Sequence, residues 1–324
     1  EKIPSEYTPK IKSQDLDSTP NFIKANLTNP FIIPGIKNLK IDSQLNLNYN
    51  FESFLEGDSN RLARSAGYAV SKRPGGTSFN PLLIFGGVGL GKTHLANAIG
   101  INVKQAFPEK TVLYISAEKF TQQYVDSVKK NNRNDFIHFY QLIDVLIIDD
   151  VQFFSGKSGT QDVFFHIFNH LHQNGKQVVL TSDKAPVDMQ EIEQRLLSRF
   201  KWGLSAELQT PDYETRISII KNKLSRDGVE MEDDIIFYVA KHIKTNIREL
   251  EGAIISLMAQ SSFNKKQITL DLAKVIVEKF VKNTKKEISI DQIQKVVSDY
   301  FQMDVSTLQS KTRKRHIVQA RQLA

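Results

Sequence analysis

The sequence has no cysteine among its 324 residues, which excludes disulfide bonds and thiolate metal sites. It also has no apolar run close to the ~20 residues that a membrane-spanning helix requires. The first residues, EKIPSEYTPKIK, lack the apolar centre of a signal peptide, and no internal repeat is visible. From these absences we expect a cytoplasmic protein.

Acidic residues are in the minority, with 36 Asp and Glu against 43 Lys and Arg, a net charge of +7. Alone, such an excess is a weak indication of an anionic partner. Its distribution is more informative, because the final stretch SKTRKRHIVQARQLA contains no acid at all. The cations in this stretch are Lys311, Arg313, Lys314, Arg315 and Arg321.

The hydrophobic share of 40% is enough for one large or two to three smaller domains with a real core. Residues 1–48 show no sustained apolar period, and we expect a linker or a disordered segment there. Residues 49–210 contain four short apolar runs: NPLLIF, TVLYIS, DVLIID and QVVLTS. Continuous rather than alternating hydrophobicity is typical of strands covered on both faces, so this part predicts an α/β domain with a parallel sheet.

After residue 210 the strand-like runs stop. We expect a small helical domain over 211–283 with three helices, in TPDYETRISIIKNKL, NIRELEGAIISLM and TLDLAKVIVEKFV. Thr210 is the expected N-cap of the first helix, with Pro211 at its first position. Asn246 and Glu249 resemble a capping pair, and Ile247, Leu250, Ile254 and Met258 share one helical face. Residues 284–324 begin a further unit, whose helix SIDQIQKVVSDYF starts with a Ser289/Gln292 capping box.

The motif G-x-x-x-x-G-K-T follows the first predicted strand and opens a helix, which is the context of a phosphate-binding loop. In such a loop, backbone N–H groups and a helix N-terminus surround a polyphosphate. Lys92 would contact the β- and γ-phosphates, and Thr93 would ligate Mg²⁺. The alternative is a glycine-rich turn without a ligand. The expected nucleotide-binding residues of the loop are Gly86, Gly87, Val88, Gly89, Leu90, Gly91, Lys92, Thr93 and His94.

Two adjacent carboxylates, Asp149 and Asp150, end the run DVLIIDD, although neighbouring side chains on a strand point to opposite faces. Some fifty residues after a phosphate-binding loop, an apolar strand ending in Asp is where such NTPases hold Mg²⁺. Asp149 would then orient the metal, and Asp150 would polarise the attacking water. Taken without the loop, the pair would be a solvated strand end.

The run QVVLTS is followed by Asp183, so Thr181, Ser182 and Asp183 lie at the carboxyl edge of the sheet, where ligands bind in open α/β folds. A polar group here could sense the γ-phosphate or position water. The alternative is an N-cap for a helix in APVDMQEI.

Arg195 and Arg199 lie one helical turn apart in EQRLLSRFKWGL, and Arg248 lies in the first turn of the helix in NIRELEGAIISLM. Arginines at such places are usually solvated surface residues. However, an arginine that contacts the γ-phosphate bound to a neighbouring protein molecule can also act in catalysis, as an arginine finger. His166 and His170 are spaced i, i+4, but the Glu of a zinc-protease motif is missing, and we interpret HIFNHLHQ as a core helix.

Together, YNFESFLEGDSNRLA, NPLLIFGGVGLGKTHLANAIG, LIIDDVQFFSGK, LTSD, RLLSRFKWGL and NIRELEGA resemble the DnaA family of bacterial chromosomal replication initiators, which are AAA+ ATPases. The resemblance runs from about Tyr49 to the end. It implies a P-loop AAA+ domain with a parallel sheet, a helical lid domain and the start of an all-α helix-turn-helix DNA-binding domain. It assigns Asp150, Asp183 (sensor 1) and the finger arginine Arg199 to catalysis, with Arg195 as a companion. It also assigns Thr93 and Asp149 to the metal, and Arg248 (sensor 2) to the nucleotide.

The resemblance also implies a function. ATP-Mg drives head-to-tail assembly into a filament on origin DNA, a contact that does not close into a ring. The filament melts the duplex and helps to load the replicative helicase, and slow hydrolysis to ADP switches it off. A further implied partner is an acidic phospholipid surface. Alternatives are an AAA+ helicase loader and an ATP-dependent regulatory protein, but a loader has no need of the basic segment after residue 284.

Val125 and Lys157 match positions at which the family binds single-stranded DNA. In relatives, the position two residues after that lysine is basic. This chain has Gly159 there, which weakens the expectation of single-strand binding. Arg321 matches an arginine that reads the minor groove, and the cations before it in a basic loop would contact phosphates. The recognition helix and the N-terminal helicase-interaction domain are not in this sequence, so we expect a fragment or an incomplete duplex reader. Its expected Kd for duplex DNA is ~10⁻⁴–10⁻⁶ M at physiological salt.

Overall fold

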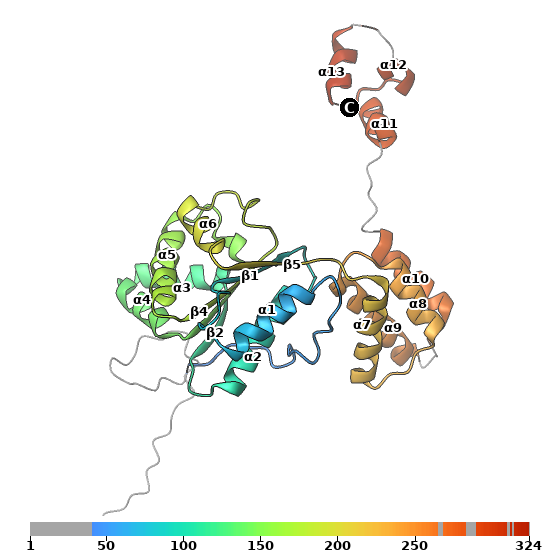
Figure 1. Cartoon of the computed structure of the whole chain (residues 1–324). Coiled ribbons are helices and arrows are strands. Elements are labelled where there is room, and N and C mark those ends of the chain that lie inside the picture. Colours follow the sequence, from blue (N-terminus) through green and yellow to red (C-terminus); the bar gives the residue numbers. More distant parts are fainter. Residues whose placement is uncertain (1–40, 265–267, 283–289, 310–311, 313, 324) are drawn as a thin grey trace, which may run out of the picture. The chain divides into compact units, whose positions relative to one another are not determined.

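The computed structural model describes residues 41–264, 268–282, 290–309, 312 and 314–323 (Figure 1). Most of the segment expected to be a linker, 1–40, lies outside these ranges. Within them, no helix combines the length and apolar character needed to cross a membrane.

A five-stranded, all-parallel sheet forms the centre of the first domain, in the order β2-β3-β4-β1-β5. The strands are β1 (Leu82–Gly86), β2 (Val112–Ser116), β3 (Val145–Asp149), β4 (Gln177–Ser182) and β5 (Leu204–Leu208). The four predicted strands and the parallel sheet are confirmed. The edge strand β5 was not predicted, because its half-exposed Leu204 and Ser205 and exposed Glu207 interrupt any continuous apolar run.

Helices cover both faces of this sheet. They are α1 (Arg61–Lys72), α2 (Lys92–Ala106), α3 (Ala117–Lys129), α4 (Arg133–Leu142), α5 (Ser158–Gln173) and α6 (Gln194–Phe200), with a 3-10 turn, η1 (Val151–Phe154). Helices α1 and α2 pack on the face that carries Leu82, Ile84 and Ile147. Figure 1 shows α3, α4 and α5 grouped on the other side of the sheet.

An aromatic cluster fills the space between the sheet and helices α3 to α5. Phe120 of α3 lies at its centre, with ring centroids 5.2 Å from Phe136, 4.8 Å from Tyr140 and 5.7 Å from Phe164. Phe164 and Phe168 of α5 are completely buried. The interpretation of HIFNHLHQ as part of a core helix is therefore confirmed.

The second part contains α7 (Tyr213–Asp227), α8 (Asp233–His242), α9 (Ile247–Asn264) and α10 (Leu270–Lys282) around a core of its own. The expectation of three helices was incomplete, since α8 was not predicted. The N-cap assigned to Thr210 was wrong: Asp212 caps α7, and its carboxylate accepts the Thr215 N–H at 2.7 Å. Asn246 does cap α9, by accepting the Glu249 N–H at 2.8 Å.

The last part contains α11 (Ile290–Tyr300), α12 (Val305–Gln309) and α13 (Arg315–Leu323). The expectation of a basic loop was wrong for 315–323, because Ile317 and Ala320 are buried on one face of α13. The capping box at Ser289 and Gln292 lies outside the residues whose side chains are described. The domain boundaries at 49, 211 and 284 stay predictions.

Candidate nucleotide-binding site

The loop between β1 and α2 is shaped by glycines. A Cβ on Gly86 would lie 2.2 Å from the carbonyl oxygen of Leu208 in the neighbouring strand β5, so any other residue would push these strands apart. Gly91 is the N-cap of α2 in the left-handed region, with φ of 97°. Val88 is exposed at the tip of the loop, while Leu90 is buried in the core. This turn exposes backbone N–H groups at a helix N-terminus, which is the arrangement that binds phosphate.

Lys92 is buried, with 6% of its surface exposed, and its ammonium group has three acceptors. Its Nζ lies 2.9 Å from the Gly86 carbonyl, 2.8 Å from the Gly87 carbonyl and 2.7 Å from Oδ1 of Asp183. An ammonium has three N–H donors, so all of them are used. A phosphate can bind Lys92 only if at least one of these partners is exchanged.

Asp149, at the end of β3, is buried and accepts hydrogen bonds from three hydroxyl groups. Thr93 Oγ1 donates to Oδ2 at 2.8 Å, Tyr114 Oη donates to Oδ2 at 2.6 Å, and Thr181 Oγ1 donates to Oδ1. Burial and the charge of Asp149 raise the pKa of Tyr114 above its usual range, so Tyr114 remains a donor. The carboxylate is therefore held in one orientation beside Thr93.

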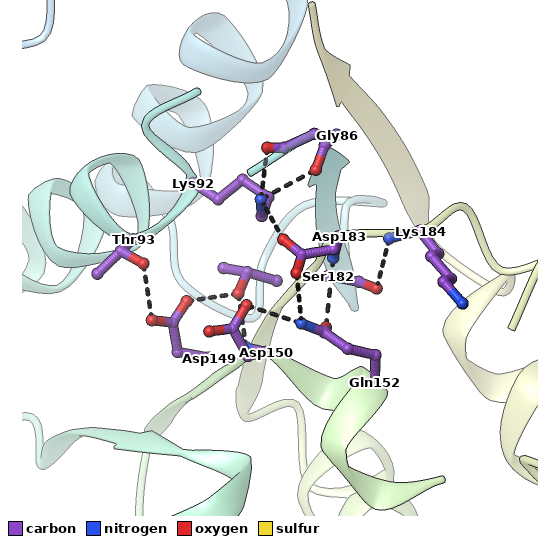
Figure 2. A network of polar contacts seen from close by, with 11 residues as sticks. Gly86, Lys92, Thr93, Asp149, Asp150, Gln152, Ser182, Asp183 and Lys184 are labelled. Atoms are coloured by element: carbon purple, nitrogen blue, oxygen red, sulfur yellow. Dashed lines mark hydrogen bonds and ion pairs between the residues drawn. The ribbon is translucent and has the colours of Figure 1, made fainter. Parts of the chain in front are cut away.

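Asp150 follows the strand in the left-handed backbone region, with φ of 61°. The strand has ended there, so the alternation of faces does not apply, and Figure 2 shows both carboxylates in one network. Nε2 of Gln152 donates to Asp150 at 3.1 Å and to Asp183 at 3.0 Å. Burial is the main cause that raises the pKa of Asp150, and the charges of Asp149 and Asp183 add to it.

The alternative interpretation of Asp183 as a helix N-cap was wrong, because residues 185–192 form turns rather than a helix. The side chain of Asp183 instead lies between Lys92 and Gln152.

The sheet edge thus brings together Lys92, Thr93, Asp149, Asp150 and Asp183, as the sequence predicted. It also adds Tyr114 and Gln152, which the sequence analysis missed. Tyr114 is the central residue of β2, where a polar hydroxyl interrupts an apolar run, whereas nothing in the sequence distinguishes Gln152.

The Thr93 and Asp149 oxygens suit Mg²⁺, which prefers oxygen ligands and is usually held by one or two carboxylates together with substrate phosphates. Within the described ranges, no three His, Cys, Asp or Glu side chains converge as a metal site. The two residues and the loop therefore fit a nucleotide with its metal.

Helix α9 reaches the phosphate loop directly. The Gly89 carbonyl accepts the N–H of Ile247 at 3.0 Å and that of Arg248 at 3.3 Å. A Cβ on Gly89, whose φ is 75°, would lie 2.9 Å from Oδ1 of Asn246 and 3.0 Å from Cβ of Arg248. The structure therefore places the exposed Arg248 beside the loop, as its predicted role requires.

The two arginines of α6 differ in their partners. Arg195 pairs with Asp162 and, at 2.6 Å, with Glu193. Arg199 has no carboxylate within 4.0 Å among the residues that the structure describes. Its guanidinium carbon lies 4.5 Å from the ring centre of Trp202 and 5.7 Å from that of Phe165. Among the described side chains, the charge of Arg195 is thus neutralised and that of Arg199 is not.

The imidazole of His94 does not face the phosphate loop. Its Nε2 lies 3.0 Å from the Asn50 carbonyl, and its ring stacks on Tyr49 at 4.9 Å and meets Phe54 edge-on at 5.3 Å. Burial lowers the pKa of His94. The side chain thus anchors the segment before α1.

The predicted DNA-binding residues fall into two groups. Val125 on α3 and Lys157 at the start of α5 are exposed, and a Cβ on Gly159 would lie 3.6 Å from the Tyr124 ring, so these segments are adjacent. In α13, Arg321 donates to the Leu308 carbonyl at 2.9 Å and to the Thr312 carbonyl at 3.3 Å. The other terminal cations are Lys314 and Arg315, both exposed, and Lys311 and Arg313, which lie outside the described residues.

A phosphate loop after β1, an aspartate at the end of β3 and a helical lid whose arginine meets the loop define a P-loop ATPase of the AAA+ class. The family model "Bacterial DnaA ATPAse domain" matches residues 45–207, and "Bacterial dnaA protein helix-turn-helix" matches residues 290–324. The chain belongs to the bacterial DnaA family, which confirms the resemblance seen in the sequence.

Curated relatives agree with this assignment. The chromosomal replication initiator protein DnaA of Flavobacterium psychrophilum is 77% identical over 100% of this chain and 68% of that protein. The one of Bacteroides thetaiotaomicron is 52% identical over 95% of this chain. The chain spans only 63% of the length of this second relative.

Solved structures show the same fold. Domain III of the Thermotoga maritima replication initiation protein DnaA is 44% identical with a TM-score of 0.71, covering 74% of this chain and 99% of that one. A replication initiator DnaA bound to AMPPCP and single-stranded DNA is 36% identical with a TM-score of 0.64, covering 86% and 81%.

Proposed function

We propose that the chain is an ATP-dependent initiator of chromosomal DNA replication. The observation that carries this proposal is the junction of two elements at one loop: Lys92 lies under the phosphate loop, and the helix that bears Arg248 is hydrogen-bonded to Gly89 of the same loop. A nucleotide held there contacts the AAA+ sheet and the lid together. Support comes from the relative that was solved with AMPPCP and single-stranded DNA.

In this proposal, a phosphate of ATP replaces at least one of the three acceptors of Lys92. The backbone amides from Gly87 to Thr93 bind the β- and γ-phosphates. Thr93 and Asp149 would hold Mg²⁺, which would neutralise charge on the phosphate oxygens. Asp150 orients the attacking water, with Gln152 fixing its carboxylate. After hydrolysis the same loop holds ADP.

Assembly follows from the unneutralised charge of Arg199. A guanidinium without a carboxylate partner suits an anionic group of another molecule, and the γ-phosphate bound to a second copy of this chain is such a group. ATP would then join copies head to tail, and ADP would not.

We propose that the assembled chains bind DNA. Single-stranded DNA would contact Val125 and Lys157, and duplex DNA would contact Lys314, Arg315 and Arg321, mainly through phosphates. Four further parts of the proposal rest on family resemblance alone. They are melting of the duplex, binding of the replicative helicase, binding to an acidic phospholipid surface, and a cytoplasmic location.

The test is size exclusion with light scattering, in ATP, ADP or no nucleotide, with single-stranded DNA added. The wild type should form larger species only with ATP. Lys92→Ala should lose ATP binding, because the buried ammonium is the main charge facing the phosphates. Arg199→Ala should keep ATP affinity yet remain monomeric. Lys201→Ala, which removes an exposed cation close by, is the matched control and should assemble normally. Assembly by Arg199→Ala would exclude the finger role and favour a helicase loader or an ATP-dependent regulatory protein.

A further inference from the structure

The described contacts of the Arg199 guanidinium are with aromatic rings. Its guanidinium carbon lies 4.5 Å from the ring centre of Trp202 and 5.7 Å from that of Phe165. Its Nε is buried and has no hydrogen-bond partner among the residues that the structure describes. An unpaired buried donor on a charged group is unfavourable, so the rings must supply much of what keeps the side chain in this place.

The rings are themselves fixed by the core. Trp202 contacts His172 in a tilted arrangement, with ring centroids 4.7 Å apart, and His172 stacks on the completely buried Phe168 at 5.9 Å. Phe165 also lies on α5, and the guanidinium carbon of Arg195 is 5.0 Å from its ring centre. Through these ring contacts, the position of α5 determines where Arg199 lies.

Aromatic contact and ion pairing both orient an arginine, but only ion pairing neutralises its charge. A carboxylate would orient Arg199 but would also neutralise it, as Asp162 and Glu193 do for Arg195. A ring face attracts the guanidinium without consuming its N–H donors or its charge. The side chain is thus oriented in advance and remains available to an anion, which lowers the ordering cost of binding.

We propose that Trp202 is a positioning residue for the ATP-dependent contact between copies of this chain: its indole, together with Phe165, holds Arg199 in the conformation that meets the nucleotide of the next copy. This inference rests on the proposed function. Trp202 is 58% exposed, so it can be replaced without opening the core.

The experiment compares Trp202→Phe with Trp202→Leu in the full chain. Both residues are apolar, but only Phe keeps a ring face. We expect Trp202→Phe to assemble with ATP at nearly the wild-type midpoint concentration. Trp202→Leu should need about three- to tenfold more protein, as the loss of one cation–π contact implies. ATP affinity of the monomer and the thermal midpoint should be the same in the two variants.

Spectroscopy gives a second readout, because Trp202 is the only tryptophan in the sequence. Arg199→Ala should change its fluorescence emission without nucleotide, since the stacked cation is gone, whereas Lys201→Ala should not. Equal assembly midpoints for Trp202→Leu and Trp202→Phe would overturn the positioning role, provided that Arg199→Ala fails to assemble. Normal assembly of Arg199→Ala would instead overturn the proposed function, and the inference with it.

Discussion

Asp183→Asn should destabilise the nucleotide-free protein and tighten ATP binding. In the described part of the chain, Asp183 is the one anionic partner of the buried Lys92, at 2.7 Å. The substitution leaves an oxygen acceptor of the same size but removes its charge. A bound triphosphate provides that charge instead, so the penalty applies only to the free protein.

The magnitude follows from the burial of the pair. Removing one partner of a fully buried ion pair costs about 3–5 kcal/mol, whereas exposed pairs contribute about 0–1 kcal/mol. Lys92 is 6% exposed and Asp183 is 35% exposed, so the pair lies between these limits. Because Lys92 keeps two carbonyl acceptors and the amide oxygen, we expect a loss of about 1–2 kcal/mol. Because this loss applies only to the nucleotide-free protein, it should increase the affinity of the variant for ATP roughly 5- to 30-fold.

Thermal unfolding without nucleotide should show a midpoint lowered by roughly 2–8 °C, and calorimetric titration should show the gain in ATP affinity. Asp188→Asn, which changes an exposed aspartate that follows the same strand, is the control and should alter neither quantity. Weaker ATP binding by Asp183→Asn with an unchanged unfolding midpoint would refute this reasoning, because Asp183 would then help to bind the nucleotide itself.

Two further predictions concern the fold. Phe164→Ala should lower the free energy of unfolding by about 3–5 kcal/mol in denaturant titration, because its completely buried ring contacts Phe120 and Phe154 and would leave a cavity. Asp212→Ala should cost about 1 kcal/mol at pH 7 through loss of the α7 N-cap. Hydrogen bonds from Thr215 lower the pKa of Asp212, so this contribution is fully present above the unfolded-state pKa of about 3.9 and is lost as the pH falls through the folded-state value. The difference between Asp212→Ala and the wild type should therefore shrink below about pH 4, and a constant difference would contradict the capping role.

The parallel sheet was predictable because its inner strands are apolar on both faces, as in LLIF of β1 and VLII of β3. The edge strand β5 has one half-exposed side and was missed for that reason. Near Thr210 the sequence offers two capping residues, and only tertiary structure selects Asp212. The helix α13 was mistaken for a loop, because its charges conceal the few apolar residues that it buries.

The site shows the same division. The loop and the two aspartates follow from spacing, since each lies directly after a predicted strand. The roles of Gln152 and Trp202 depend on contacts between segments that no local pattern reveals. Arg195 and Arg199 are not distinguished by helical spacing; the family resemblance separates their roles, and the structure adds that their partners differ.

The bonds from α9 to Gly89 have a consequence for backbone dynamics. The first N–H groups of a helix have no partner within it. In α9, those of Ile247 and Arg248 are satisfied by the carbonyl of Gly89, so the phosphate loop completes the helix. Any nucleotide that shifts Gly89 must also change how often these two amides open to solvent. Their deuterium exchange rates therefore report on the occupancy of the loop, even if the Arg248 side chain is removed.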